Sequence, residues 1–176
     1  MPFGEDGAVH PQPSGAAFDV VLVLHVGSVV AGIVTTATAA ATATRLRRLA
    51  GSGTPLPETL RRYFRPGVNW AGRTMWGIPI FGFALVAMSR GAYAVTDGWV
   101  LTGLVLFVAL ALVAEGVLWP AERRVQTALA VGSDAHVTAG PASAGGAAGA
   151  ATTMVRAAGV VLVLLASGTV VMIAQP

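Results

Sequence analysis

The hydrophobic positions of this 176-residue chain fall into four long runs, and the stretches between them hold most of its charged residues. A helix needs about 20 residues, at 1.5 Å each, to cross the hydrocarbon core of a bilayer. Each run is long enough, so the pattern predicts an all-α transmembrane four-helix bundle. The expected spans are residues 18–44, 74–93, 99–119 and 157–174.

The segments outside these spans differ in character. Residues 1–17 carry two acidic residues and no arginine, unlike the positively charged start of a signal peptide. We therefore expect a tail at 1–17 followed by one membrane domain, 18–176, with loops at 45–73 and 120–156. Within the second loop, the Ala- and Gly-rich stretch 140–153 has little bulky apolar surface, which predicts a flexible linker.

The positive charges give an orientation. All eleven are arginines, and ten lie in the two long loops, which leaves only Arg90 between the second and third spans. The positive-inside rule therefore puts both loops in the cytoplasm and both termini outside. Tryptophans near the expected boundaries are typical of an aromatic belt; they are Trp70, Trp76, Trp99 and Trp119.

Composition narrows the function classes. With 55 % hydrophobic and 11 % charged residues, and a mean hydropathy of +0.71, the chain lies outside the range of soluble domains. Its arginines border apolar runs rather than forming a basic aromatic face, so no nucleic-acid partner is expected. The absence of cysteine excludes thiolate metal sites and covalently attached haem. Abundant Ala, Val and Gly with no Lys is typical of a GC-rich bacterial genome, which predicts a bacterial plasma (inner) membrane location.

Two polar residues lie inside the expected spans, where such groups are costly and are therefore functional candidates: His25 and Glu115. Counted from the outer face, they lie roughly 10 Å and 24 Å deep, which is too far apart for a hydrogen bond. Arg73 begins the second span on the side where Glu115 lies, and Arg123 is a competing partner. We expect an Arg73–Glu115 ion pair that fixes helix register more than it adds stability; proton or substrate handling and simple snorkelling of Glu115 to the interface stay open.

His25 has three interpretations: an interhelical hydrogen bond, a haem or metal ligand, or a proton-linked role. The first is favoured, with no cofactor bound. The second would use Met88 and Met172, which are expected at the same depth. A histidine with thioethers can hold copper, and a histidine with a methionine can ligate haem b.

Small residues near His25 predict close helix packing. Gly27 and Ala31 are four apart, as are Ser28 and Gly32, and this spacing lets another helix approach closely. We expect packing within the bundle, with homodimerisation as the alternative.

Three short motifs carry a resemblance: "LHVGSVVAG", "LVAEGVLWPAERR" and the terminal "VVMIAQP". They resemble a family of uncharacterised bacterial four-helix integral membrane proteins, known only as a domain of unknown function. More distantly, the arrangement is similar to the membrane domains of copper-resistance D proteins and of HemJ, a haem-associated protoporphyrinogen oxidase. In HemJ-like proteins the first-helix histidine belongs to the functional site, so the resemblance implies a role in binding haem or copper for His25.

These observations predict a non-enzymatic membrane subunit or scaffold. A haem- or copper-associated membrane protein centred on His25 is the alternative, and a small transporter is third. The expected partners are the lipid bilayer and either other membrane subunits or further copies of this chain.

Overall fold

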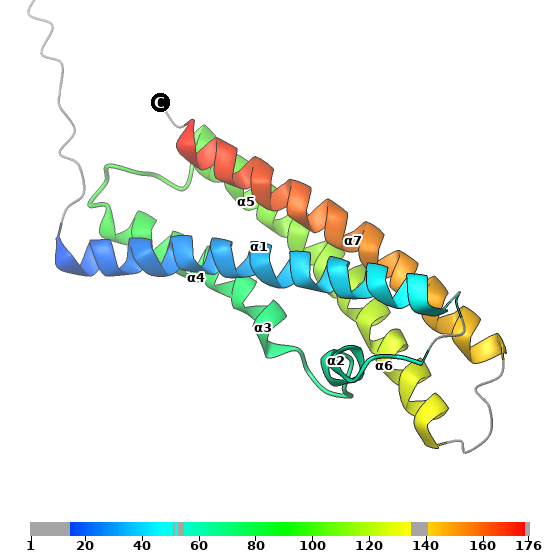
Figure 1. The fold of residues 1–176 in the computed structure, drawn as a ribbon. Helices are drawn as coiled ribbons and strands as arrows, with labels where there is room; N and C mark the ends of the chain where they lie inside the picture. The colour runs from blue at the N-terminus through cyan, green and yellow to red at the C-terminus, as the bar shows by residue number, and fades with distance from the viewer. Residues whose placement is uncertain (1–14, 51, 53–54, 135–140, 175–176) are drawn as a thin grey trace, which may run out of the picture.

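The computed structural model describes residues 15–50, 52, 55–134 and 141–174. This part of the chain is all-helical, without strands, and Figure 1 shows its long helices side by side. The elements in chain order are α1 (Ala16–Ala50), α2 (Glu58–Tyr63), α3 (Trp70–Arg73), the 3-10 turn η1 (Thr74–Trp76), α4 (Gly77–Met88), α5 (Gly98–Val113), the π-helical turn η2 (Ala114–Leu118), α6 (Trp119–Asp134) and α7 (Pro141–Ile173).

Four helical segments are long and apolar enough to cross a membrane, which confirms the expected number of spans in the described residues. They are Ala16–Ala50, Trp70–Met88, Gly98–Ala130 and Gly145–Ile173. The start of α1 and the end of α7 lie at the same end of the bundle (Figure 1). We call this the α1-start end.

Three of these segments are longer than a bilayer is thick. α1 has 35 residues and α7 has 33, so each measures about 50 Å, against about 30 Å for the hydrocarbon core. The third continues from α5 through η2 into α6. Much of the expected loop 120–156 is therefore helix, and these helices are longer than the hydrocarbon core requires.

The expected flexible linker at 140–153 is also helical, from Pro141 onward, which corrects that prediction. Its small side chains are packed rather than solvated: Ala147 is 4 % exposed and Ala151 is fully buried. Small side chains let α7 approach α1 and α6 closely, and this tertiary packing stabilises a helix that local composition does not favour.

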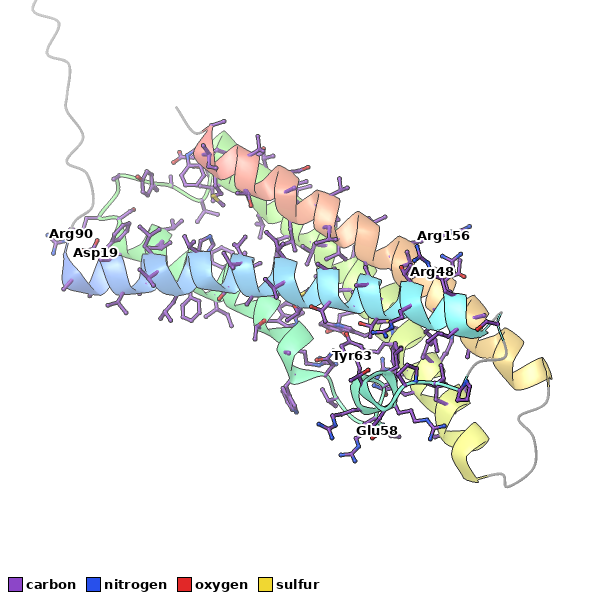
Figure 2. All side chains as sticks on the ribbon, viewed as in Figure 1. Asp19, Arg48, Glu58, Tyr63, Arg90 and Arg156 are labelled. Atoms are coloured by element: carbon purple, nitrogen blue, oxygen red, sulfur yellow. The ribbon has the colours of Figure 1, made fainter. Side chains whose placement is uncertain are left out.

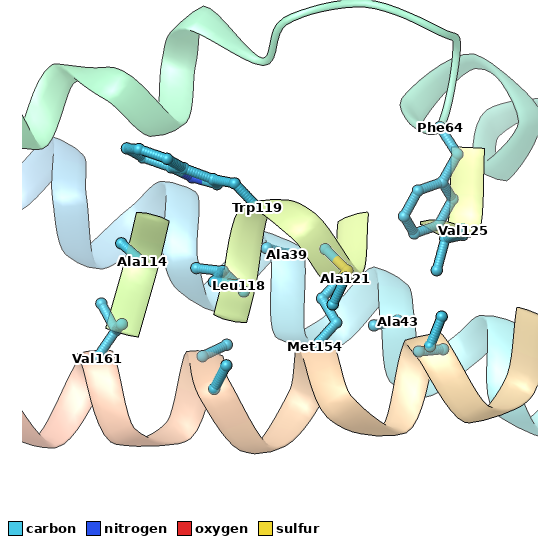
Figure 3. Packing of buried hydrophobic residues seen from close by; sticks show 14 of the residues in the cluster. Ala39, Ala43, Phe64, Ala114, Leu118, Trp119, Ala121, Val125, Met154 and Val161 are labelled. Atoms are coloured by element: carbon cyan, nitrogen blue, oxygen red, sulfur yellow. The ribbon is translucent and has the colours of Figure 1, made fainter. Parts of the chain in front are cut away.

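Exposed apolar side chains and the buried core occupy different halves of the molecule. Large exposed apolar residues run along α1 from Val20 to Val34, along α5 and η2 from Leu101 to Val117, and along α7 from Val160 to Ile173. Most of the buried cluster lies beyond these bands, in the half that we call the stem (Figure 3). It joins the C-terminal part of α1, α2, α6 and the first half of α7; buried there are Ala39, Ala43, Leu46, Leu60, Phe64, Ala121, Val125, Ala151 and Met154.

This division follows from the difference between water and lipid as surroundings for apolar side chains. Burial in the stem removes apolar surface from water and is strongly favourable. In lipid no such force acts between helices, so their apolar surfaces can stay exposed to acyl chains.

The long helices form two pairs, α1 with α4 and α7 with the continuous α5–α6 helix. The two pairs meet where α1 packs against α7. α4 packs against α1, while α5 and α6 pack against α7. The second and third spans therefore belong to different pairs. Toward the α1-start end the two pairs diverge (Figure 1).

The small residues of α1 take different roles. A Cβ placed on Gly77 would overlap the Ser28 hydroxyl, so α1 and α4 touch there. Gly32 is buried, and a Cβ there would lie 3.7 Å from Met75 and Leu165 atoms. Ala31 is half-buried, and Gly27 is exposed with nothing within 4 Å of a Cβ. The close contact is thus made by Ser28 and Gly32.

The packed state of the former linker can be tested at Ala151. Ala151→Leu adds three carbons at a fully buried position and should destabilise the bundle by about 1–3 kcal/mol through overpacking. Thermal unfolding in detergent measures this. Ala166→Leu, on the exposed side of the same helix, is the control and should leave the melting temperature nearly unchanged. A harmless Ala151→Leu would indicate an unpacked linker.

Candidate functional site

A cavity of about 460 Å³ lies at the α1-start end, between the diverging pairs. Its size falls within the range of small-molecule sites, roughly 300–1,000 Å³, and its wall is mainly apolar. α1, α4 and α5 supply most of the wall, and Tyr93 and Met172 complete it. The larger apolar members are Phe18, Leu22, Ile78, Phe83, Leu104 and Phe107.

The polar side-chain groups of this wall belong to Asp19, His25, Tyr93 and Trp99, and the His25 ring is held by α4. Its Nδ1 lies 2.9 Å from the Ile78 carbonyl oxygen. A carbonyl oxygen only accepts, so Nδ1 carries the proton and donates it. In the neutral ring the lone pair then belongs to Nε2. No residue that the structure describes hydrogen-bonds Nε2, which leaves this nitrogen able to accept a hydrogen bond from a ligand.

Gly82 makes room for the imidazole. A Cβ at this position would lie 3.6 Å from His25 Nδ1 and 3.3 Å from Cε1, and the second distance is tighter than most Cβ contacts. Because position 82 has no side chain, the ring can lie flat enough on α4 to reach the Ile78 carbonyl. The predicted interhelical hydrogen bond of His25 is therefore present.

The rim of the cavity is ordered by Ser89, which is 2 % exposed. Its hydroxyl donates to the Val86 carbonyl at 2.7 Å and accepts from the Tyr93 backbone N–H at 3.1 Å. The intervening turn is tight, with Arg90 at φ 53° and a glycine after it at φ 88°. Tyr93 then meets Trp99 edge to face at 5.4 Å, and both residues line the cavity.

Of the two candidate methionines, only Met172 lies in the cavity wall. Met172 lines the cavity together with His25, and its methyl group lies 3.1 Å from where a Cβ of Gly103 would be. Met88 is not part of the cavity wall. The cavity thus joins one imidazole and one thioether, rather than the imidazole and two thioethers expected for copper. Within the described residues, no group of three or more His, Cys, Asp or Glu side chains has metal-binding geometry.

A second polar site lies where the exposed apolar bands of the helices meet the stem. Arg73 Nη1 lies 3.7 Å from Glu115 Oε1, so the expected ion pair is formed, and it links η2 to the start of the second span. The Arg73 guanidinium also lies 4.4 Å from the centre of the Trp119 ring. Both charged side chains remain partly exposed, at 32 % and 44 %, so the pair contributes little to stability.

Next to this pair is a buried carboxyl group that was not among the candidates from the sequence. Glu122 is 5 % exposed, and its Oε1 accepts a hydrogen bond from Asn69 Nδ2 at 3.0 Å. The Asn69 amide oxygen in turn accepts from the Gly72 N–H at 3.3 Å and caps α3. Glu122 therefore ties the segment before the second span to α6.

Position 122 lies in the expected loop 120–156, so its burial is not predicted from the sequence. The hydrophobic pattern nevertheless contains a signal for that burial. Leu118, Ala121, Val125 and Leu129 continue a helical apolar period past Pro120, and that period would have placed position 122 near the packed face.

Tyr63 lies against this cluster from α2. Burial, and then the negative charge of Glu122, raise the pKa of the Tyr63 phenol to about 12; hydrogen bonds with Thr42 and Asn69 lower it partly. The phenol thus connects α1, α2 and the loop before α3.

Comparison with known proteins returns nothing for this chain: no family model, no curated protein and no solved structure matches it. Any function must therefore be argued from the cavity and the polar clusters.

The ion pair predicts a charge-reversal pattern. Glu115→Arg should destabilise the bundle by about 0.5–1 kcal/mol, because two partly exposed guanidinium groups would then face each other. Adding Arg73→Glu should restore part of the loss. The rescue stays incomplete because Arg73 also contacts Trp119. Melting temperatures of both single variants and the double variant measure the coupling, and additive losses would contradict the pair.

The phenol predicts a pH dependence. A folded-state pKa near 12, against about 10 when unfolded, means that the folded chain holds the proton more tightly. The stability from Tyr63 is therefore fully present below pH 10 and is lost as the pH rises towards 12. Ultraviolet titration of tyrosinate should show a late-titrating phenol that disappears in Tyr63→Phe. Glu122→Gln should lower its pKa without restoring 10, because burial remains; an unchanged pKa would contradict the charge contribution.

Proposed function

We propose that this chain is a non-enzymatic, multi-pass membrane protein that binds a small, mainly apolar molecule in the cavity beside His25. The observation that supports this is the fixed ring: Nδ1 is held by Ile78, and Nε2 has no partner among the described residues. His25 lines the cavity, so a ligand with a hydroxyl or N–H donor can hydrogen-bond this acceptor nitrogen. The expected ligand has an apolar body and one such donor group.

The cavity wall is mainly apolar, which favours the binding of an apolar molecule. Its described residues include no Ser, Thr, Cys or Lys nucleophile, and its ionisable side chains are Asp19, His25 and Tyr93. This agrees with a membrane subunit or scaffold, in which the bound molecule stabilises the bundle or is presented to other membrane proteins.

The proposed setting is the plasma (inner) membrane of a bacterium, with both termini outside. The support is the charge distribution: ten of eleven arginines lie in the segments that join the first to the second span and the third to the fourth. In this orientation the cavity opens in the outer half of the bilayer, where an apolar molecule can enter from lipid.

A second candidate is haem b bound through His25. A histidine that ligates a metal through Nε2 commonly donates its Nδ1–H to a carbonyl, as His25 does. Met172 on the same wall is the second available ligand type.

The decisive test is purification from native membranes in mild detergent, followed by extraction, mass spectrometry and an optical spectrum. We expect a bound apolar molecule in the wild type. Gly82→Leu should release it by filling the site beside the imidazole. His25→Ala should weaken its binding about two- to tenfold, the value of one hydrogen bond. Gly27→Leu, on the open face of α1, is the matched control and should retain it.

The outcomes separate the candidates. A Soret band that disappears in His25→Ala would replace the first candidate with the haem protein. Equal retention by Gly82→Leu and the control would place the molecule elsewhere, and a wild type without any bound molecule would refute ligand binding.

A further inference from the structure

α2 is a short helix with two unlike sides. Leu60 is 1 % exposed, and Phe64, which follows the helix, is 2 % exposed; both pack into the stem core. Arg61, Arg62 and Arg65 are exposed on the other side. In Figure 2, Tyr63 points toward the bundle, and long nitrogen-tipped side chains extend outward around Glu58. The buried side therefore fixes the direction in which the guanidinium groups point.

The level of α2 along the bundle is set by Tyr63, which hydrogen-bonds Thr42 of α1. Thr42 lies eight residues past Val34, where the exposed apolar band of α1 ends, which is a rise of about 12 Å. The head-group layer extends about 5–8 Å beyond the hydrocarbon core. The distance that remains between the level of α2 and the head-group layer is about the length of an arginine side chain. It is also within a Debye length of about 8 Å.

The chain between α2 and the second span exposes apolar side chains in this same layer. Trp70 is 74 % exposed and Val68 is 55 % exposed. Tryptophan exposed beside a membrane span is typical of an interfacial anchor. Trp70 is the first residue of α3, which continues through η1 into α4.

Charge compensation on this surface is slight. Glu58 is the one exposed acidic residue between Pro55 and Arg73. The neighbouring carboxylates are engaged: Glu122 is buried against Asn69, and Glu115 pairs with Arg73. Three exposed guanidinium groups therefore give this surface a net positive charge.

We infer that Arg61, Arg62, Arg65 and Trp70, here named the α2 surface, bind the head groups of anionic phospholipids. Each guanidinium can donate two parallel hydrogen bonds to a phosphate, while the indole inserts among the acyl chains' upper carbons. This role is separate from the His25 cavity, which lies at the opposite end of the bundle. The exposed indole beside the arginines favours a lipid over a soluble phosphate compound.

The test uses the full chain, delipidated in neutral detergent and given mixed phosphatidylglycerol and phosphatidylcholine. Native mass spectrometry then counts the lipids bound. The wild type should be enriched in phosphatidylglycerol. The triple variant R61Q/R62Q/R65Q should lose at least tenfold of that enrichment at low salt, because each arginine near a membrane surface contributes roughly fivefold.

Arg45, Arg47 and Arg48 provide the matched control. They are exposed and carry the same charge, but lie eleven to fourteen residues past Val34, about 16–21 Å beyond the apolar band. R45Q/R47Q/R48Q should therefore keep most of the enrichment. R61K/R62K/R65K retains the charge and should keep a large part of it. Melting temperatures of all variants verify folding.

Three results would overturn the inference. An equal loss of enrichment in the control triple and the α2 triple would assign the effect to net charge alone. Wild-type enrichment in the α2 triple would show that these arginines do not bind the lipid. Complete displacement of the lipid by excess glycerol 3-phosphate would identify the surface as a site for soluble phosphate compounds.

Discussion

The packing of α7 against α1 is the interaction on which the rest of the structure depends. Each of the other long helices rests on one of these two: α4 on α1, and α5 and α6 on α7. The contact is made close by small buried side chains, such as Ala39 and Ala43 on α1 and Ala151 and Ala158 on α7. Removing water from these surfaces stabilises the stem, and the stem then holds the helices that continue into the apolar band.

That arrangement explains why a cavity exists at the other end. Helices fixed at one end by a dry core need not touch along their whole length. In lipid, separation of α4 from α5 costs little, because acyl chains solvate apolar side chains as well as a protein neighbour does. The polar contact that remains there, between His25 and Ile78, holds α4 on α1 and leaves α5 apart.

The sequence was sufficient for features that depend on local pattern. The four spans follow from run length, and the Arg73–Glu115 pair follows from helix direction and depth. The hydrogen bond of His25 was expected, but its partner was not, since a backbone carbonyl leaves no mark in the sequence. The helical linker was missed for a related reason: Ala147 and Ala151 form a helix because of the surfaces they meet, and those surfaces lie far away in the chain. Glu122 was missed because the local apolar period that continues past Pro120 was not followed.

The π-helical turn η2 sets the faces of the helix on either side of it. Residues seven apart in an α-helix lie nearly on one face, since seven steps of 100° fall only 20° short of two turns. Glu115 and Glu122 are seven apart, yet one is 44 % exposed in its side chain and the other is 5 % exposed. A π-turn winds more residues into each turn than an α-turn, so it offsets the faces before and after it. One continuous helix thereby presents an acid to Arg73 at the bilayer edge and turns the next acid inward to Asn69. The change of face at the π-turn therefore places two identical carboxyl groups of one helix in different surroundings.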